Sequence, residues 1–455
     1  MASHAVKAIA NGRADGASRR IGLGIAIAFG FVAAALPTIA QTQANAETNA
    51  SPATNSPVAK ADSSSDDSLG KGPFEMRAGP FKFHPRVTAG MIYDDNILLN
   101  GTGKEADEEW VIHPAIQAVA GDDAALIDYR DNKYDILGLN PGTFIVQQPD
   151  AWPGKFLVID YGPQFQLFDK YTANNHVDQL GTLNLIWPVG KLILGLKQDY
   201  NLSKTEIVEF DQRTTVETIN TALSAAYQLS EATSIESNFR RIGIGYDQAG
   251  LTGYTEYNTE DWFNYQVSEE MPVSLGVLAG EDVVTKHQSQ TYEQLRARAR
   301  YNYTEKLVFD ASVGAELRQY QSKSTDTLNP VFTVAGEYRP AVRTSLRLSG
   351  FRQLYASIFN GYNYTATGAA LEVRQGITER FTAAVSGGYY NLEFIGVVPN
   401  TTDYTGEYHF ARASLDAKIL RHLSGQIFYQ YLGTKSQSVN SIVDNQTGFQ
   451  LTLSY

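Results

Sequence analysis

The chain has 455 residues, no cysteine and a formal net charge of −12. Without cysteine there is no disulfide framework, thiolate metal site or cysteine nucleophile. The acidic balance argues against a nucleic-acid partner, because phosphate binding requires a basic surface.

The first 46 residues have the features of a secretory signal peptide. A basic segment precedes an apolar run of about 16 residues, 21–36, which is shorter than the roughly 20 that a helix needs to span a bilayer. Cleavage is therefore favoured over anchoring, and small residues offer sites after Ala40 or after Ala46. The basic residues are Lys7, Arg13, Arg19 and Arg20.

Residues 47–80 are predicted to form a disordered linker in the periplasm. From 47 to 72 they are mainly Ser, Asp, Ala, Thr, Asn and Pro, with almost no side chains to bury. Such a segment cannot offset the entropy lost on ordering.

An alternation of apolar and polar residues begins at Phe81 and continues to the end of the chain. In 295–301 four apolar residues alternate with three arginines, and 307–317 and 411–418 follow the same rule. Side chains of a strand point to opposite faces in turn, so each segment has one apolar and one polar face. The segments span about 10–14 residues, whereas soluble strands average about 5–6 and tilted membrane strands need about 9–11. Their length favours membrane strands.

The connections between these segments alternate between short polar turns, such as 188–190 and 304–306, and longer loops. Membrane barrels have short periplasmic turns and longer external loops. The sequence therefore predicts an all-β, up-and-down antiparallel transmembrane barrel over 81–455, with 18 strands, or 16 as the alternative count. An even count requires that 122–155 is a periplasmic connection. The predicted strands are 81–93, 110–121, 156–168, 176–187, 191–203, 216–228, 233–245, 255–267, 272–284, 292–303, 307–320, 328–338, 342–353, 362–375, 380–394, 408–418, 422–432 and 445–455.

The last predicted strand ends on an aromatic residue. It resembles the C-terminal signal by which the barrel-assembly machinery of bacterial outer membranes recognises its substrates. A strand with apolar alternate positions can add to an open sheet edge by main-chain pairing. We therefore expect that machinery as a partner during biogenesis, and outer-membrane lipid and lipopolysaccharide around the finished barrel. The apolar face comprises Phe449, Leu451, Leu453 and Tyr455, and the lumen face comprises Gln450, Thr452 and Ser454.

Three short motifs open the barrel: FHPRV at 83–87, GMIYDDNI at 90–97 and WVIHP at 110–114. They resemble the β-barrel porin family often encoded in exopolysaccharide loci, in which the first strand ends in a Tyr-Asp-x-Asn-Ile turn. The similarity extends to the layout of most of the mature chain, although only these motifs are specific. The resemblance implies an outer-membrane barrel of a Gram-negative bacterium that passes hydrophilic solutes, associated with exopolysaccharide export.

The polar faces of neighbouring predicted strands carry a group of charged residues that we expect to face the lumen. One interpretation is a basic stripe, with acids opposite, that biases passage of a polar or anionic solute. The other is a ladder of salt bridges that satisfies an interior wall, in which each exposed pair adds little stability. The residues are Arg296, Arg298, Arg300, Asp310, Glu316, Arg318, Glu337 and Arg347.

Four aromatic side chains are also predicted to face the lumen, where their rings suit stacking on sugars: Trp262, Tyr320, Tyr390 and Phe428. A register slip of one residue would turn each of them outward. The acidic first loop, 94–109, offers hard oxygen donors that suit Ca²⁺ or Mg²⁺, with a solvated loop as the alternative.

The sequence contains no catalytic constellation, nucleotide-binding loop or zinc motif, and no cofactor or metal is predicted. The leading prediction is a passive pore for hydrophilic solutes, because a barrel of 16–18 strands leaves an aqueous interior. A non-conducting structural or adhesive barrel is the competing interpretation, and a membrane-embedded hydrolase is the third. A polysaccharide is the expected solute partner, and the oligomeric state is left open.

Overall fold

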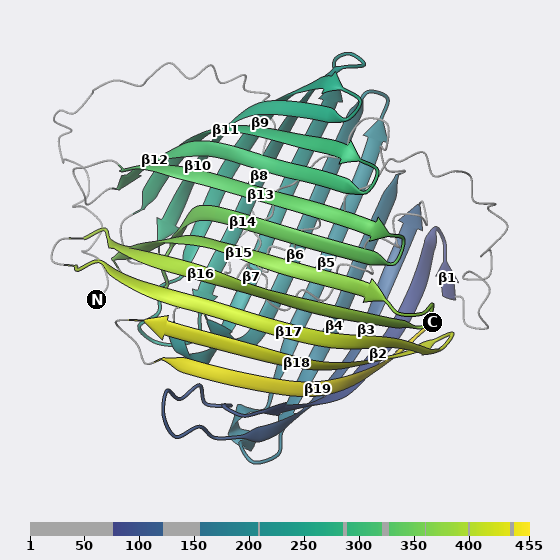
Figure 1. The fold of residues 1–455 in the computed structure, drawn as a ribbon, viewed down its shortest axis with the longest axis vertical. Coiled ribbons are helices and arrows are strands. Elements are labelled where there is room, and N and C mark those ends of the chain that lie inside the picture. The colour runs from purple at the N-terminus through teal and green to yellow at the C-terminus, as the bar shows by residue number, and fades with distance from the viewer. Residues whose placement is uncertain are drawn as a thin grey trace, which may run out of the picture. The chain divides into compact units, whose positions relative to one another are not determined.

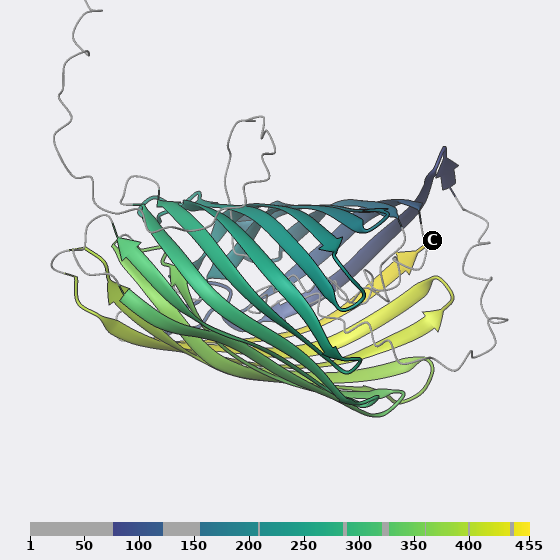
Figure 2. The same ribbon diagram turned by 90° about the horizontal axis from the view of Figure 1, so that it is seen from above.

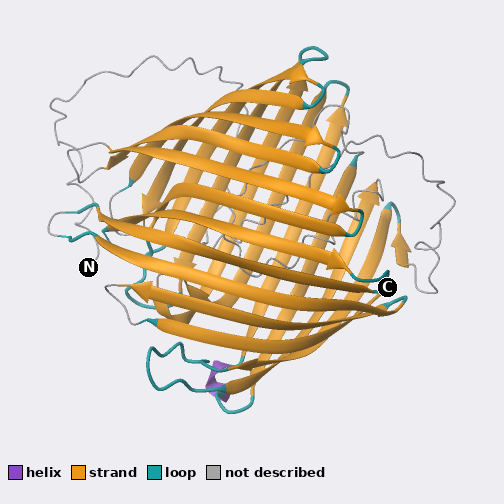
Figure 3. Cartoon of the chain, viewed as in Figure 1, coloured by secondary structure: helices purple, strands orange, loops and turns teal. Residues whose placement is uncertain are grey.

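The computed structural model describes residues 76–121, 155–207, 210–284, 289–320, 327–359, 361–398, 401–436 and 441–455. These residues form one antiparallel sheet that closes on itself (Figures 1 and 3). The predicted signal peptide, most of the predicted linker and the connection 122–154 lie outside the described residues.

Eighteen long strands form the wall, each paired with its neighbours in chain order, and β19 pairs with β2 to close the barrel. The structure confirms the predicted closed antiparallel barrel and the count of eighteen rather than sixteen. The strands are β2 (Phe81–Asp94), β3 (Asp107–Gly121), β4 (Phe156–Phe168), β5 (His176–Val189), β6 (Leu192–Ile207), β7 (Phe210–Gln228), β8 (Thr233–Tyr246), β9 (Tyr254–Ser268), β10 (Met271–Val284), β11 (Gln290–Thr304), β12 (Leu307–Tyr320), β13 (Thr327–Ala341), β14 (Thr344–Ala356), β15 (Tyr362–Gly376), β16 (Phe381–Gly396), β17 (Tyr404–Leu420), β18 (Leu423–Ser436) and β19 (Ile442–Ser454).

Several strands extend further than predicted. β7 begins at Phe210 instead of 216, and β17 begins at Tyr404 instead of 408. Main-chain pairing continues there into sequence whose side chains no longer alternate between apolar and polar, so the alternation alone underestimates strand length.

A short strand, β1 (Met76–Ala78), lies within the stretch predicted as linker and pairs with Phe81–Phe83 of β2. The turn between them contains Gly79 at φ +59°, a conformation that suits glycine. The pairing of β19 with β2 ends near Pro85, whose carbonyl accepts the backbone N–H of Tyr455 at 3.1 Å. β1 pairs with the part of the same β2 edge that lies before this point. The pairing covers main-chain groups that an open edge would expose.

The two ends of the barrel differ in their connections, as the sequence predicts. At one end, which we call the turn end, hairpins of two to four residues join the strands from β5 onward, and Tyr455 also lies there. At the opposite end, the loop end, the connections include 95–106, 247–253 and 397–403. Figure 2 shows the same strands in a second view. The only helical element of the described residues is a 3-10 turn at Thr172–Asn174, in the β4–β5 loop (Figure 3).

The outer face of the barrel is apolar. Leu275, Leu295 and Leu348 are each nearly 60% exposed on it (58%, 59% and 58%). Exposed aromatic side chains occur toward both ends, such as Tyr303 at the turn end and Trp110 at the loop end. An apolar band between two aromatic girdles is the lipid-facing surface of a membrane barrel. No helix among the described residues is long and apolar enough to cross a membrane.

The closing strand β19 has its apolar set on this outer face and its polar set on the other. Phe449 and Leu451 pair in register with Met91 and Ala89 of β2. On the opposite face, the hydroxyls of Thr452 and Thr88 lie 2.9 Å apart across the closure. The exposed set comprises Phe449 (42%), Leu451 (44%), Leu453 (39%) and Tyr455 (40%).

Candidate functional site

The interior of the barrel is identified by contacts between strands that are not neighbours. Arg298 of β11 donates to Glu236 of β8 at 2.7 Å, three strands away. Asn363 of β15 donates to Gln290 of β11 at 2.6 Å, four strands away. Side chains of separated strands meet only across the concave face of a closed sheet, so these polar side chains lie inside.

The three arginines of β11 lie on this inner face, and each has an acidic partner. Besides the Arg298–Glu236 pair, Arg296 lies 3.9 Å from Glu260 and Arg300 lies 3.8 Å from Asp310, measured between nitrogen and carboxylate oxygen. Each positive charge is therefore compensated by the wall, and the arginines do not form a bare basic stripe. Glu236 and Glu260, on β8 and β9, were not among the predicted partners, because strand alternation does not indicate contacts between separated strands.

Arg318 is the centre of a network that excludes water. It donates to Glu316 at 2.6 Å and to Asp282 of β10 at 2.9 Å, and the three side chains are 3%, 0% and 4% exposed. Its guanidinium also lies 4.5 Å from the ring centre of Tyr292. Gln294 donates to the second oxygen of Glu316 at 2.6 Å. Both carboxylates therefore have several partners, as buried charges require.

Glu337 and Arg347 are register partners across β13 and β14. The ion pair of Glu337, however, is with Arg339, whose Nε donates at 2.5 Å. Arg339 was not among the predicted residues, although it follows Glu337 by two positions and therefore shares its face of the strand.

The four aromatic side chains predicted to face the lumen are all buried: Trp262, Tyr320, Tyr390 and Phe428 are 4%, 8%, 4% and 6% exposed. Arg298 lies 4.2 Å from the ring centre of Trp262 and Arg412 lies 4.5 Å from that of Phe428. Tyr390 stacks on Tyr408, with 5.9 Å between the ring centres. These ring faces contact protein side chains rather than standing open to a sugar.

Glycines of the neighbouring strands explain why these rings lie flat against the wall. Gly448 faces Phe428 so closely that an added Cβ would lie 2.7 Å from its ring, and at Gly276 it would overlap the ring of Trp262. The pairing of an inward aromatic residue with an inward glycine on the next strand is visible in the sequence once the register is known.

Near the loop end, strands β14 to β18 carry an aromatic cluster inside the barrel. Phe394 and Tyr404 stack with 4.3 Å between their ring centres and an interplanar angle of 8°. The cluster narrows the interior by packing on itself. Its buried members are Phe351, Ala366, Tyr390, Leu392, Phe394, Tyr408 and Phe410.

The β14–β15 loop extends across the opening at the loop end. Ile358 of this loop is 3% exposed and packs in one cluster with Val216 of β7, seven strands away. Its carbonyl accepts the backbone N–H of Thr252, in the β8–β9 loop, at 2.9 Å. These contacts join two separated parts of the rim.

Arg213 of β7 makes a second connection across the interior. Its guanidinium donates to Asp94 of β2, five strands away, and lies 3.7 Å from Glu109 of β3. The Asp94 side chain is 1% exposed, so its carboxylate is out of contact with water. This contact could not be predicted from the sequence, because Arg213 stands 119 positions from Asp94.

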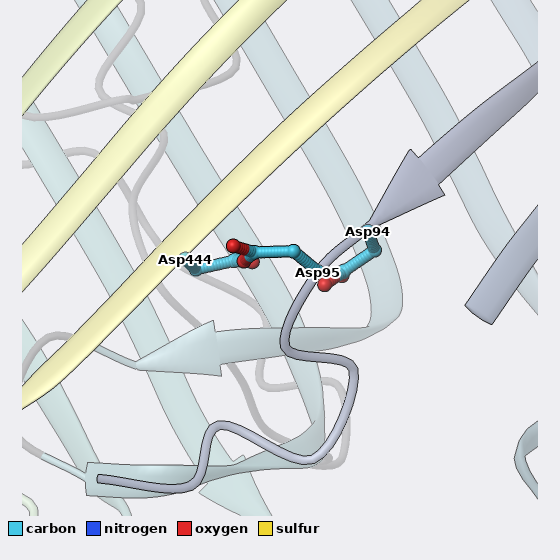
Figure 4. Close-up of side chains that lie close together, drawn as sticks. All are labelled: Asp94, Asp95 and Asp444. Carbon is cyan, nitrogen blue, oxygen red and sulfur yellow. The ribbon is translucent and has the colours of Figure 1, made fainter. Parts of the chain in front are cut away.

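Two acidic residues of the first loop and one of β19 form a group that could hold a metal ion. The carboxylates of Asp94, Asp95 and Asp444 lie within 4.8 Å of one another where β2 ends and β19 begins (Figure 4). Arg213 donates to Asp94, and Lys104 donates to Asp95 at 2.9 Å. Protein cations thus compensate the two carboxylates that come from the first loop.

Elsewhere in this region the acids order the loop backbone. Asp107 accepts the backbone N–H groups of Lys170 and Tyr171, at 3.0 and 2.9 Å. Burial works to raise the pKa of Asp95, but hydrogen bonds from Lys104 and Asn445 outweigh it and hold the pKa below its usual value.

No protein-family model matches the sequence, and no curated protein matches it. Solved structures with a similar fold include OccAB4 of Acinetobacter baumannii, at 8% identity and a TM-score of 0.44, covering 83% of this chain and 99% of that one. OpdQ of Pseudomonas aeruginosa also has 8% identity and a TM-score of 0.44, covering 83% of this chain and 100% of that one. The outer membrane protein opdK of Pseudomonas aeruginosa has 12% identity and a TM-score of 0.40, covering 82% and 99%.

Proposed function

We propose that this chain is a porin-like barrel of the bacterial outer membrane that passes small hydrophilic solutes through a lumen narrowed at the loop end. The observation that carries this proposal is the contrast between the two faces of the wall. The outer face is apolar, while the inner face carries charged side chains that keep contact with water toward the turn end, such as Asp310 at 32% exposure. Barrels of 16–18 strands leave an aqueous interior.

In this proposal, the lumen is narrowest at the loop end. There the β14–β15 loop packs on Val216, and Arg213 bridges β7 to β2. A solute of polymer size would not pass this constriction without rearrangement of the loops. We therefore expect small solutes and single-channel conductance below that of an open barrel of the same strand number.

Conductance across planar lipid bilayers tests the proposal. The wild-type protein is expected to give discrete, small steps. Ile358→Asp places a charge in the apolar contact with Val216, which is fully buried, and should release the loop and raise the step size several-fold. Ile377→Asp is a matched control, because Ile377 is 59% exposed in a hairpin at the turn end and should leave the steps unchanged.

A non-conducting structural or adhesive barrel is the second candidate. It is favoured by the dense packing at the loop end, where Asp94, Val216 and Glu316 are completely buried. If both the wild type and Ile358→Asp are silent in the bilayer while the barrels are folded, the structural role replaces the pore. A membrane-embedded hydrolase is the third alternative, and hydrolysis of lipid or ester substrates by the refolded protein would support it.

We also propose an association with exopolysaccharide export. The motifs at 83–114 support it by their resemblance to the porin family, and no contact inside the barrel bears on it. Deleting the gene should then reduce surface polysaccharide while leaving the other outer-membrane proteins intact. An unchanged amount of polysaccharide contradicts this part of the proposal and leaves the passage of small solutes unaffected.

Recognition of the C-terminal strand by the assembly machinery is also part of the proposal. The exposed positions Phe449 and Tyr455 end a strand that must add to the edge of β2. Replacing both with Ser should reduce the amount of folded protein in the outer membrane more than the same change at the equally exposed Tyr301 and Phe309 of the wall. Equal reductions would show that only wall packing was lost.

A further inference from the structure

The outer face of β9 contains one acidic side chain inside the apolar band. The residues exposed on this strand alternate from Tyr257 to Val267, and Asp261 is one of them. Its neighbours along the strand on the same face are Thr259 and Phe263, and Phe263 is 49% exposed. Across the sheet it pairs with the exposed Val277 of β10, which is 55% exposed.

Asp261 lies deep in that band rather than at its edge. Tyr257 and Tyr265 are the exposed aromatic residues on either side, four positions away in each direction. At about 3.3 Å per residue and a strand tilt of about 40°, four residues correspond to roughly 10 Å along the membrane normal. Along β9, Thr259 separates Asp261 from Tyr257 on one side, and Phe263 separates it from Tyr265 on the other.

The carboxyl group of Asp261 has no hydrogen bond or ion pair in the part of the chain that the structure describes. A charged side chain on the lipid face destabilises a barrel, and a carboxylate without donors in hydrocarbon is costly. The cost disappears if a second surface covers the position and supplies a donor.

The same patch carries a suitable donor. Ser237 of β8 is the register partner of Asp261, is exposed on the same face, and its hydroxyl also has no partner among the described residues. β8 and β9 are neighbouring, paired strands of the sheet. Neighbouring strands are about 4.8 Å apart, so at a tilt of about 40° these two residues differ in membrane depth by only about 3 Å.

Two copies inserted in the same direction are related by an axis along the membrane normal, which preserves depth. A residue can then meet only residues of its own depth in the other copy. A two-fold contact is self-complementary: if residue i meets j, then j meets i. Ser237 and Asp261 can satisfy this condition, since one is a donor, the other an acceptor, and their depths differ by about 3 Å, which two side chains can span.

We propose that the outer face of β8 and β9 around Ser237 and Asp261 binds a second copy of this chain in a two-fold symmetric dimer. In this dimer, the Ser237 hydroxyl of each copy donates to the Asp261 carboxylate of the other. The exposed side chains of Ile235, Phe239 and Phe263 surround the polar pair and exclude lipid from it.

Cysteine cross-linking of the full-length protein in membranes tests the dimer, because the natural chain has no cysteine. Ile235→Cys, on the same face of β8 as Ser237, keeps the polar pair and should give a band of two copies with a short bifunctional thiol reagent. Val313→Cys on β12 is the matched control, since Val313 is 51% exposed on the outer face but belongs to another part of the wall. Absence of the band from Ile235→Cys, or equal bands from both variants, overturns the proposal.

A second variant distinguishes a dimer contact of Asp261 from exposure of this side chain to lipid. Asp261→Leu should reduce the dimer fraction in native mass spectrometry at least ten-fold while the barrel stays folded, as judged by its heat-modifiable migration. If the wild type is a single copy, or is bound to a different protein, the proposal is wrong. An Asp261→Leu variant that keeps the wild-type mass and melts at a higher temperature would mean that Asp261 faces lipid.

Discussion

Two regions of the barrel interior carry the same kinds of charged residue but differ in how completely these residues are buried. Toward the turn end, the Arg300–Asp310 pair keeps contact with water, with the two side chains 17% and 32% exposed. Toward the loop end, Arg318 and Glu316 are 3% and 0% exposed. The same kinds of residue thus form a hydrated ion pair in one region and a dry network in the other.

The connections account for this difference. At the loop end, Ile358 of the β14–β15 loop points toward the interior and contacts β7, seven strands away in the sheet. The aromatic cluster on β14 to β18 also lies toward that end. Strand alternation therefore decides which side chains face inward, while the loops and the aromatic packing decide how much water remains beside them.

The largest expected effect comes from removing the cation of the dry network. Arg318→Ala leaves Glu316 and Asp282 buried without their common partner, and such a loss costs about 3–5 kcal/mol. The same change at Arg300 should cost about 1 kcal/mol or less, because its partner is partly hydrated. Equilibrium unfolding of both variants by denaturant in lipid vesicles measures the difference. Equal costs would contradict the contrast between the two regions.

A smaller effect is expected where glycine makes room for an inward ring. Gly276→Ala forces the ring of Trp262 to move, and overpacking of this kind costs about 1–3 kcal/mol. Gly350→Ala is the matched control, because the nearest atom to its added Cβ would lie 3.5 Å away, an ordinary contact. The same unfolding measurement applies, and a cost at Gly350 as large as at Gly276 would rule out the steric explanation.

Much of this barrel could be predicted from the sequence, because the period of a strand is local. The alternation in 295–301 defines the two faces of β11 without knowledge of any other strand. The length of the segments and the alternating lengths of the connections then give the class and the number of strands. The ends of strands such as β7 were underestimated, and the short strand β1 was not predicted.

The contacts inside could not be predicted in the same way. Arg298 and Glu236 stand 62 positions apart, and no local rule relates residues of strands that are not neighbours. The position of Ile358 depends on the path of a loop whose sequence has no period. For this reason the aromatic residues were expected to be open to sugars, whereas the structure covers them with Arg298, Arg412 and Tyr408.

Ion selectivity tests whether the wall of the turn-end half is in contact with the conducting solution. Replacing Arg296, Arg298 and Arg300 together with Ser leaves Glu236, Glu260 and Asp310 uncompensated. The lumen becomes more negative there, so the reversal potential in a salt gradient should shift toward a several-fold greater preference for cations. The triple Lys variant keeps the charge and serves as the control. Unchanged selectivity would leave these arginines only the role of packing the wall.

The smallest expected effect is a pH dependence at the rim of the loop end. Burial works to raise the pKa of Asp95, but hydrogen bonds from Lys104 and Asn445 lower it overall. A carboxyl whose pKa is lower in the folded state stabilises the fold above its unfolded pKa of about 3.9, and this contribution disappears as the pH falls through the folded value. Because the side chain is 28% exposed, the contribution should be about 1 kcal/mol or less. Wild type should therefore melt slightly above Asp95→Asn at about pH 6 and converge with it at about pH 2. A gap between the two proteins that widens as the pH falls would reverse the sign and contradict the lowered pKa.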